Sequence, residues 1–123
     1  MEKGMNWYIA KIIYQVISGE GEHTPQFDEQ FRLIRADETA WAWEKASVIA
    51  RMEQSLFLNS KREEVQWKFI AVEDVSMIES LEDGTQCYAQ TIEPYDAEEY
   101  VMISQSRAKR FFSLEDKRIL PVQ

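Results

Sequence analysis

Residues 7–17, WYIAKIIYQVI, constrain the fold most, because they are apolar on both sides of an extended chain. Successive side chains of a β-strand point to opposite faces, so Tyr8 and Ile12 share one face while Ile9 and Ile13 share the other. Both faces of such a strand must be covered. We therefore expect an inner strand, or a strand whose second face is covered by a helix or a partner.

Three further stretches have the alternation of strands. Residues 26–36 alternate apolar and polar side chains and are expected to form a hairpin with the first strand. Residues 63–80 should contain a long third strand. The dipeptide Asp83-Gly84 is typical of a hairpin turn, which predicts that residues 85–92 return as a fourth strand.

Residues 37–59 have helical periodicity, with Asp37 available as the N-cap and Asn59 placed to end the helix. At 100° per residue, one face collects small and apolar side chains, which we expect to pack on the sheet. The members of this face are Ala42, Ala46, Ile49, Leu56 and Phe57. A second apolar stripe, formed by Trp41, Val48 and Met52, lies about a quarter turn away and needs a cover other than the sheet.

A second helix is predicted from the capping-box spacing of Asp96 and Glu99, and it should run to about Phe112. The expected order is β-β-α-β-β-α, an α+β fold with a mostly antiparallel four-stranded sheet and two helices packed on it. We expect residues 1–112 to form a single domain and residues 113–123 a C-terminal tail.

The composition argues against several classes of function. A net charge of −8 opposes diffuse attraction to phosphate backbones, so nucleic acid is not an expected partner. The first 17 residues have the pattern of neither a signal peptide nor a membrane span, so we expect a cytoplasmic protein that does not bind a membrane. The single cysteine, Cys87, cannot form an intrachain disulfide and is expected to be a small buried residue.

Charge is unevenly distributed along the chain. Residues 63–99 hold eleven acidic side chains and one basic one, whereas residues 100–123 hold five basic and two acidic side chains. One interpretation is a solvated acidic face followed by basic residues that favour the C-terminal end of a helix. The other is that residues 107–118 dock on the acidic region of the same chain or a neighbouring one.

The only histidine, His23, lies in the glycine-spaced segment 19–31 among several carboxylates. Imidazole and carboxylate can bind zinc, iron or manganese, but a zinc site needs three or four ligands held rigidly. Gly19 and Gly21 make this segment the most permissive of the chain. We therefore expect a polar bend between two strands, with no metal and no cofactor.

Two charges occur where burial is expected. Lys11 is the only charged residue in the first strand, and Glu53 lies in the middle of the predicted core face of the first helix. A buried charge needs a partner or a shifted pKa, and such groups concentrate at functional sites. One hypothesis is that Lys11 and Glu53 pair in or beside the core. The alternative is that both side chains extend to solvent along their methylene groups.

Several ordered segments resemble the bacterial domain-of-unknown-function 4288 family. These are WYIAK (7–11), QFDEQFRLIRA (26–36), VQWKFIAVEDV (65–75), LEDGTQCY (81–88) and EPYDAEEY (93–100). The resemblance spans about residues 6–105 and consists of sheet and turn patterns without a catalytic signature. It implies a small bacterial cytoplasmic protein and assigns no activity, cofactor or catalytic residue.

Three hypotheses for function follow. The first is a non-enzymatic protein-interaction module that self-associates through Trp41, Val48 and Met52, with a contribution from the tail. The second is an acidic protein that captures a basic partner, such as a toxin, with residues 63–99 accelerating the encounter. The third is a small-molecule-binding protein or enzyme with a pocket between sheet and helix that uses Lys11, Glu53, Tyr14 or His23.

Overall fold

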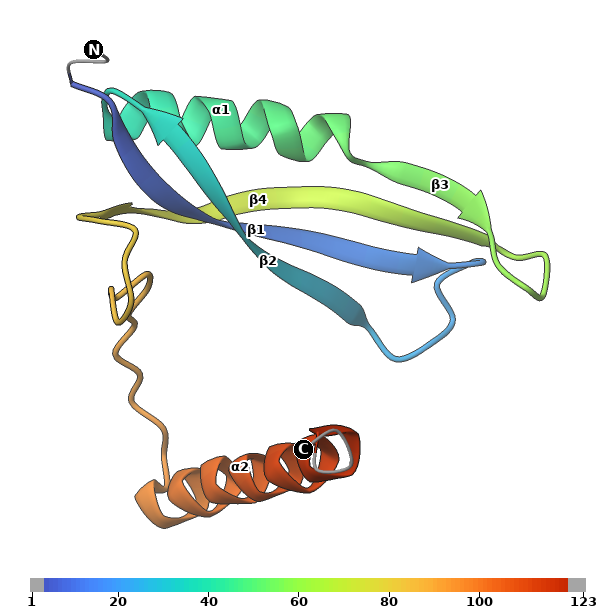
Figure 1. Cartoon of the computed structure of the whole chain (residues 1–123). Coiled ribbons are helices and arrows are strands. Elements are labelled where there is room, and N and C mark those ends of the chain that lie inside the picture. The colour runs from blue at the N-terminus through green and yellow to red at the C-terminus, as the bar shows by residue number, and fades with distance from the viewer. Residues whose placement is uncertain (1–3, 120–123) are drawn as a thin grey trace. The chain divides into compact units, whose positions relative to one another are not determined.

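The computed structural model describes residues 4–119 and their side chains as far as residue 114 (Figure 1). By its contacts the chain divides into two compact units, Met1–Ala89 and Gln90–Gln123. The first unit contains a four-stranded sheet and one helix, and the second contains one long helix. That residues 1–112 act as a single domain stays a prediction.

The predicted α+β fold and the β-β-α-β-β-α order are confirmed. The elements are β1 (Asn6–Ser18), β2 (Gln26–Ala36), α1 (Thr39–Met52), β3 (Ser55–Leu58), β4 (Glu64–Ile78) and α2 (Ala97–Ile119). The strand order in the sheet is β2-β1-β4-β3, and all three neighbouring pairs are antiparallel. Helix α1 lies along one face of this curled sheet (Figure 1).

Strand β1 is the inner strand that its sequence predicted, because β2 and β4 flank it. Its side chains at Tyr8, Ala10, Ile12 and Tyr14 are buried beneath α1. The helix meets them with Ala42, Ala46 and Ala50, all fully buried, whose small side chains let the helix approach the sheet closely. This contact forms the core of the first unit.

The first helix is shorter than predicted. Its N-cap is Glu38, not Asp37, and it ends at Met52, not near Asn59. The side-chain oxygen of Gln54 accepts a hydrogen bond from the backbone N–H of Phe69 at 3.0 Å, which connects the end of the helix to β4.

The residues after α1 form strand β3, so Leu56 and Phe57, expected in the core, are exposed on a strand that pairs with β4. Asn59 shapes the turn between these strands. Its side-chain oxygen accepts hydrogen bonds from the N–H groups of Lys61 and Glu63 at 2.8 and 3.0 Å. The sequence signal at Asn59 is therefore that of a turn and not of a helix end.

The predicted fourth strand at residues 85–92 is wrong, and β3 takes its place in the sheet. A turn does form at the predicted dipeptide, where the N–H of Thr85 donates to the carbonyl of Glu82 at 3.1 Å. The chain then lies against the face of the sheet opposite α1, and the Tyr88 ring packs on Phe31 with centroids 5.0 Å apart. Alternation does not distinguish a paired strand from an extended segment packed on a sheet face.

Helix α2 starts as predicted, since the Asp96 carboxylate accepts a hydrogen bond from the N–H of Glu99 at 3.1 Å. It runs past the predicted end at Phe112 to Ile119. All its side chains from residue 97 to 114 are exposed. Within residues 4–119, no helix combines the length and apolar character needed to cross a membrane.

Candidate functional site

The face of the sheet opposite α1 holds an ion cluster in which Lys11 is shielded and its two carboxylate partners are exposed. The Lys11 side chain is 10% exposed, and its ammonium lies 2.9 Å from the carboxylate of Glu73 and 3.3 Å from that of Glu29. The Tyr88 ring lies on the same side, with its centroid 6.0 Å from the ammonium. The register of β1 and β4 shifts between Lys11 and Ile12, so Glu73 forms a bulge beside the lysine.

The cluster keeps Lys11 charged. Hydrogen bonds to Glu73 and then to Glu29 raise the pKa of Lys11 above its ordinary value of 10.5, and they outweigh the opposing effect of burial. A lysine that acts as a nucleophile or a general base needs a lowered pKa. The geometry therefore gives Lys11 the role of a fixed cation.

The hypothesis that Lys11 pairs with Glu53 is wrong. Glu53 follows the last turn of α1, and its carboxylate pairs with Arg32 of β2 at 2.5 Å. Arg32 lies opposite Ala10, on the face that α1 covers, whereas Lys11 points to the other face. The sheet separates the two groups because neighbouring strand residues face opposite ways.

Tyr14, a further member of the hypothesised pocket, is part of the core. Its hydroxyl donates a hydrogen bond to the carbonyl of Ala50 at 2.7 Å, in the last turn of α1. Burial raises the pKa of this hydroxyl above its ordinary value, and the nearby negative charge of Glu53 adds to the shift. Tyr14 thus anchors the helix to the sheet, and the predicted gathering of Lys11, Glu53, Tyr14 and His23 does not occur.

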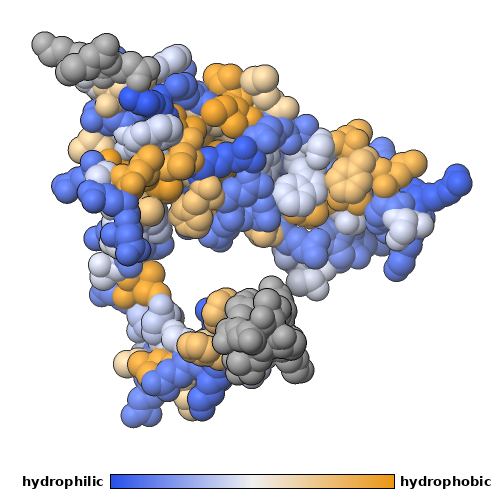
Figure 2. All heavy atoms as spheres, in the orientation of Figure 1, coloured by the Kyte–Doolittle hydropathy of each residue, from blue (hydrophilic) through white to orange (hydrophobic). Residues whose placement is uncertain are grey.

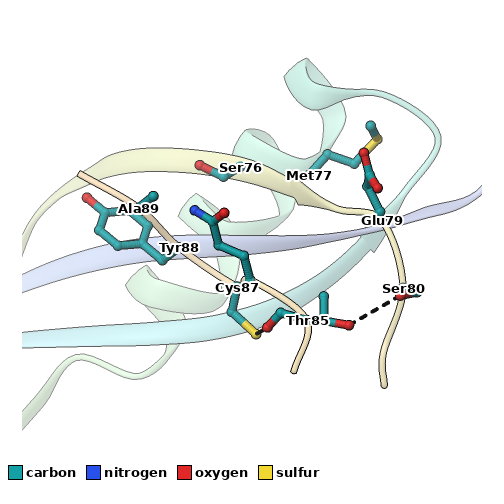
Figure 3. Close-up of a pocket in the computed structure, with 9 residues that line it drawn as sticks. Ser76, Met77, Glu79, Ser80, Thr85, Cys87, Tyr88 and Ala89 are labelled. Carbon is teal, nitrogen blue, oxygen red and sulfur yellow. Dashed lines mark hydrogen bonds between the residues drawn. The ribbon is translucent and has the colours of Figure 1, made fainter. Parts of the chain in front are cut away.

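A pocket of about 510 Å³ lies where the segment after the turn approaches the end of β4 (Figure 3). Its lining includes Ser76, Met77, Glu79, Ser80 and residues 85–89. The Ser80 and Thr85 hydroxyls are 3.2 Å apart and hydrogen-bonded, as Figure 3 shows. Cys87 is exposed here, so its predicted burial is wrong.

The only histidine lies far from this thiol. His23 follows β1, whereas the pocket adjoins Met77, which pairs with Tyr8 near the start of β1. Ten residues of strand separate Tyr8 from Ser18, which corresponds to roughly 33 Å. Cys87 and His23 therefore cannot act as a nucleophile and base within one chain.

The His23 segment is the polar bend that its sequence predicted. The N–H of Ser18 donates to Nε2 of His23 at 3.0 Å, and Nδ1 donates to the carbonyl of Thr24 at 2.8 Å. Gly21 adopts a φ of +83°, which favours glycine. In the described part of the chain, no three His, Cys, Asp or Glu side chains are grouped so as to hold a metal ion.

The predicted stripe on α1 is exposed. Trp41, Val48 and Met52 are 48%, 51% and 79% exposed, and hydrophobic residues reach the surface over α1 in Figure 2. Lys45, on the same flank of the helix, binds the carbonyl of Arg35 at 2.6 Å. This contact directs the stripe toward the β2 side of the unit.

A second exposed apolar row lies on β2 and consists of Phe27, Phe31 and Leu33, each about half exposed. Alternation places these side chains together, and an apolar row of this kind ordinarily faces the core. Here α1 covers the other face of β2, where Asp28, Gln30 and Arg32 lie. The alternation predicted that these three side chains share a face. It did not predict that they are exposed, because that depends on which face of the sheet α1 covers.

Asp28, Gln30 and Arg32 form a polar ladder along the α1 face of β2. The Gln30 amide donates to Asp28 at 2.7 Å, and Arg32 donates to the Gln30 oxygen at 2.9 Å. The ion pair between Arg32 and Glu53 fixes the far end of the ladder. The three side chains are thereby ordered in a line beside an open strand edge.

Comparison with known proteins identifies a family. A family model described as "Domain of unknown function (DUF4288)" matches residues 7–89, a range that falls within the first unit. The expected resemblance to this family is confirmed over these residues. No curated protein and no solved structure matches the chain. On the family match, which covers more than half of its length, this chain belongs to the DUF4288 family.

Proposed function

We propose that this protein is a non-enzymatic protein-interaction module that self-associates through the β2 side of its first unit. The observation that carries the proposal is that exposed apolar side chains flank one open sheet edge on both faces. The stripe of Trp41, Val48 and Met52 flanks it on α1, and the row of Phe27, Phe31 and Leu33 lies on β2 itself.

Burial of these side chains favours association. Removing apolar surface from water contributes about 25 cal/mol per Å², and a specific interface buries roughly 1,600 Å² in total. An aromatic or aliphatic cluster near the centre of such a patch supplies most of its binding energy. Trp41 and Phe31 are the candidates for this central role.

The chemistry of the other groups supports binding over catalysis. Lys11 is held as a cation between two carboxylates, and Cys87 is separated from the single histidine by the length of β1. The acidic binder of a basic partner and the small-molecule site stay as alternative hypotheses. If the protein retains a basic partner at low salt and releases it at high salt, the result would favour the acidic binder.

Light scattering of the purified full chain tests the proposal. We expect the wild-type protein to have twice the 14.5 kDa mass of one chain. Replacing Trp41→Ser together with Met52→Ser should raise the dimer dissociation constant at least roughly thirtyfold, because central interface side chains contribute about 2 kcal/mol or more.

Leu56→Ser is the matched control, because Leu56 is 66% exposed and lies on β3 at the opposite edge of the sheet. This variant should keep the wild-type mass. A wild-type monomer at all accessible concentrations overturns self-association. Dissociation by Leu56→Ser but not by the double variant would place the interface elsewhere and contradict the proposed surface.

A further inference from the structure

Strand β2 is an unusual sheet edge. It has eleven residues and, within residues 4–119, pairs with β1 alone, whereas the opposite edge strand, β3, has four. A long edge strand presents unpaired N–H and C=O groups to any second strand, and proteins usually shorten or cover such edges. Helix α1 contacts this strand near its end, where the Lys45 ammonium donates to the carbonyl of Arg35 at 2.6 Å.

The sequence of β2 is complementary to itself about Gln30. In an antiparallel pair of two β2 strands centred on this residue, Asp28 of each copy lies opposite Arg32 of the other. Phe27 lies opposite Leu33, which pairs two apolar side chains on the other face. Directly opposed charges of opposite sign and directly opposed apolar side chains both stabilise antiparallel pairs.

Neighbouring registers lose the two charge pairs, although centring the pair on Glu29 still places Phe27 opposite Phe31. Centring the pair on Glu29 would place two Glu29 carboxylates opposite each other, which is destabilising. Centring it on Phe31 would place Asp28 opposite the apolar Ile34 and leave both charges of the ladder without an opposed partner. Centring on Gln30 places Glu29 opposite Phe31, so the two pairs of Asp28 with Arg32, which the neighbouring registers lack, are what select Gln30 as the centre.

We propose that two copies of this chain pair through antiparallel β2 strands, with a two-fold axis at Gln30, to form one continuous eight-stranded sheet. This inference rests on the proposed self-association and specifies its geometry. The axis makes the interface isologous, as in most homodimers. Both α1 helices lie on one face of the joined sheet, with their Trp41 stripes toward the axis.

The spacing of the elements agrees with this arrangement. Strands in a sheet are about 4.8 Å apart, so the two β1 strands, over which the helices lie, are separated by about 14 Å across the axis. Packed helices are usually about 8–10 Å apart, so side chains of the stripe have to fill the remaining distance, and Met52, at the end of α1 that contacts Tyr14 and Arg32, lies nearest the axis. On the other face, the rows of Phe27, Phe31 and Leu33 from the two copies become continuous.

Charge exchange tests the register. In a homodimer, the substitution Asp28→Arg places two pairs of like charges opposite one another, and so does Arg32→Asp. Each variant should therefore have a dimer dissociation constant at least roughly tenfold higher than that of the wild type. Mixing the two variants restores both pairs, so the mixture should recover the dimer. Circular dichroism of each variant establishes that it is folded, and a folded mixture that stays monomeric overturns the register.

Cross-linking gives a second measurement that does not depend on charge. In a Cys87→Ser background, Gln30→Cys should oxidise to a disulfide-linked dimer, because directly opposed residues have Cβ atoms close to disulfide distance. The matched control is Gln66→Cys in the same background, an exposed glutamine on β4 that should stay unlinked.

The outcomes separate the two proposals. A wild-type dimer whose Gln30→Cys variant is no more cross-linked than the Gln66→Cys control keeps the self-association and overturns the β2 pairing. A wild-type monomer overturns both. If the Phe111→Ser substitution on α2 dissociates the dimer while the charge variants stay dimeric, the contact lies on α2. This result also overturns the β2 pairing.

Discussion

Replacing Tyr14→Ala is expected to lower the free energy of unfolding by about 3–5 kcal/mol, the range for removing a buried aromatic side chain. Tyr14 is 1% exposed and is one of the two largest fully buried side chains. Its ring contacts Trp67 and Phe69 of β4, with centroid distances of 6.1 and 6.2 Å. Because small domains are stable by only about 5–15 kcal/mol, this loss brings the fold close to its limit. Urea unfolding followed by tryptophan fluorescence measures it.

Tyr14→Phe is the matched control, because it keeps the ring and removes only the hydroxyl. The carbonyl of Ala50 then loses its partner, at an expected cost of about 1–2 kcal/mol. A loss with Tyr14→Ala that is no greater than that with Tyr14→Phe would contradict the packing role of the ring.

The predictable part of the fold followed from periodicity in long segments. The alternation of apolar and polar side chains, although interrupted at Glu29 and Ile34, located the bounds of β2, and the two-sided apolar pattern of β1 identified an inner strand. The errors occurred where a short segment fits two structures. Leu56 and Phe57 continue the helical pattern of α1, yet a strand of four residues that pairs with β4 was preferred over another turn of helix.

The candidate site was less predictable, because it depends on which elements cover which faces. Trp41, Val48 and Met52 could be identified as surplus apolar surface from helical spacing alone. The position of Lys11 could not, because its partners come from β2 and from a bulge in β4. Neither the strand order nor the shift of register that leaves Glu73 beside Lys11 is specified by local sequence.

Lys11→Glu is expected to lower the thermal unfolding midpoint by roughly 10 °C or more, since it places a third carboxylate between Glu29 and Glu73. Lys11→Met is the contrasting variant. It keeps an unbranched apolar chain of similar length under the Tyr88 ring, and the two glutamates, each more than half exposed, can then be solvated. We therefore expect Lys11→Met to unfold near the wild-type midpoint at pH 7. Circular dichroism melts of the three proteins measure these differences.

The pH dependence of these melts identifies the role of the ammonium. The pKa of Lys11 is raised in the folded protein, so its charge stabilises the fold fully below the ordinary value of 10.5, and this contribution is lost as the pH rises above it. The wild-type midpoint should fall between pH 10 and 11.5 more steeply than that of Lys11→Met. Because Tyr14 also has a raised pKa and is present in both proteins, its alkaline contribution cancels in the comparison. Equal slopes would contradict the role of Glu29 and Glu73 in holding the Lys11 ammonium, because the two carboxylates would then stabilise its charge no more than solvent does.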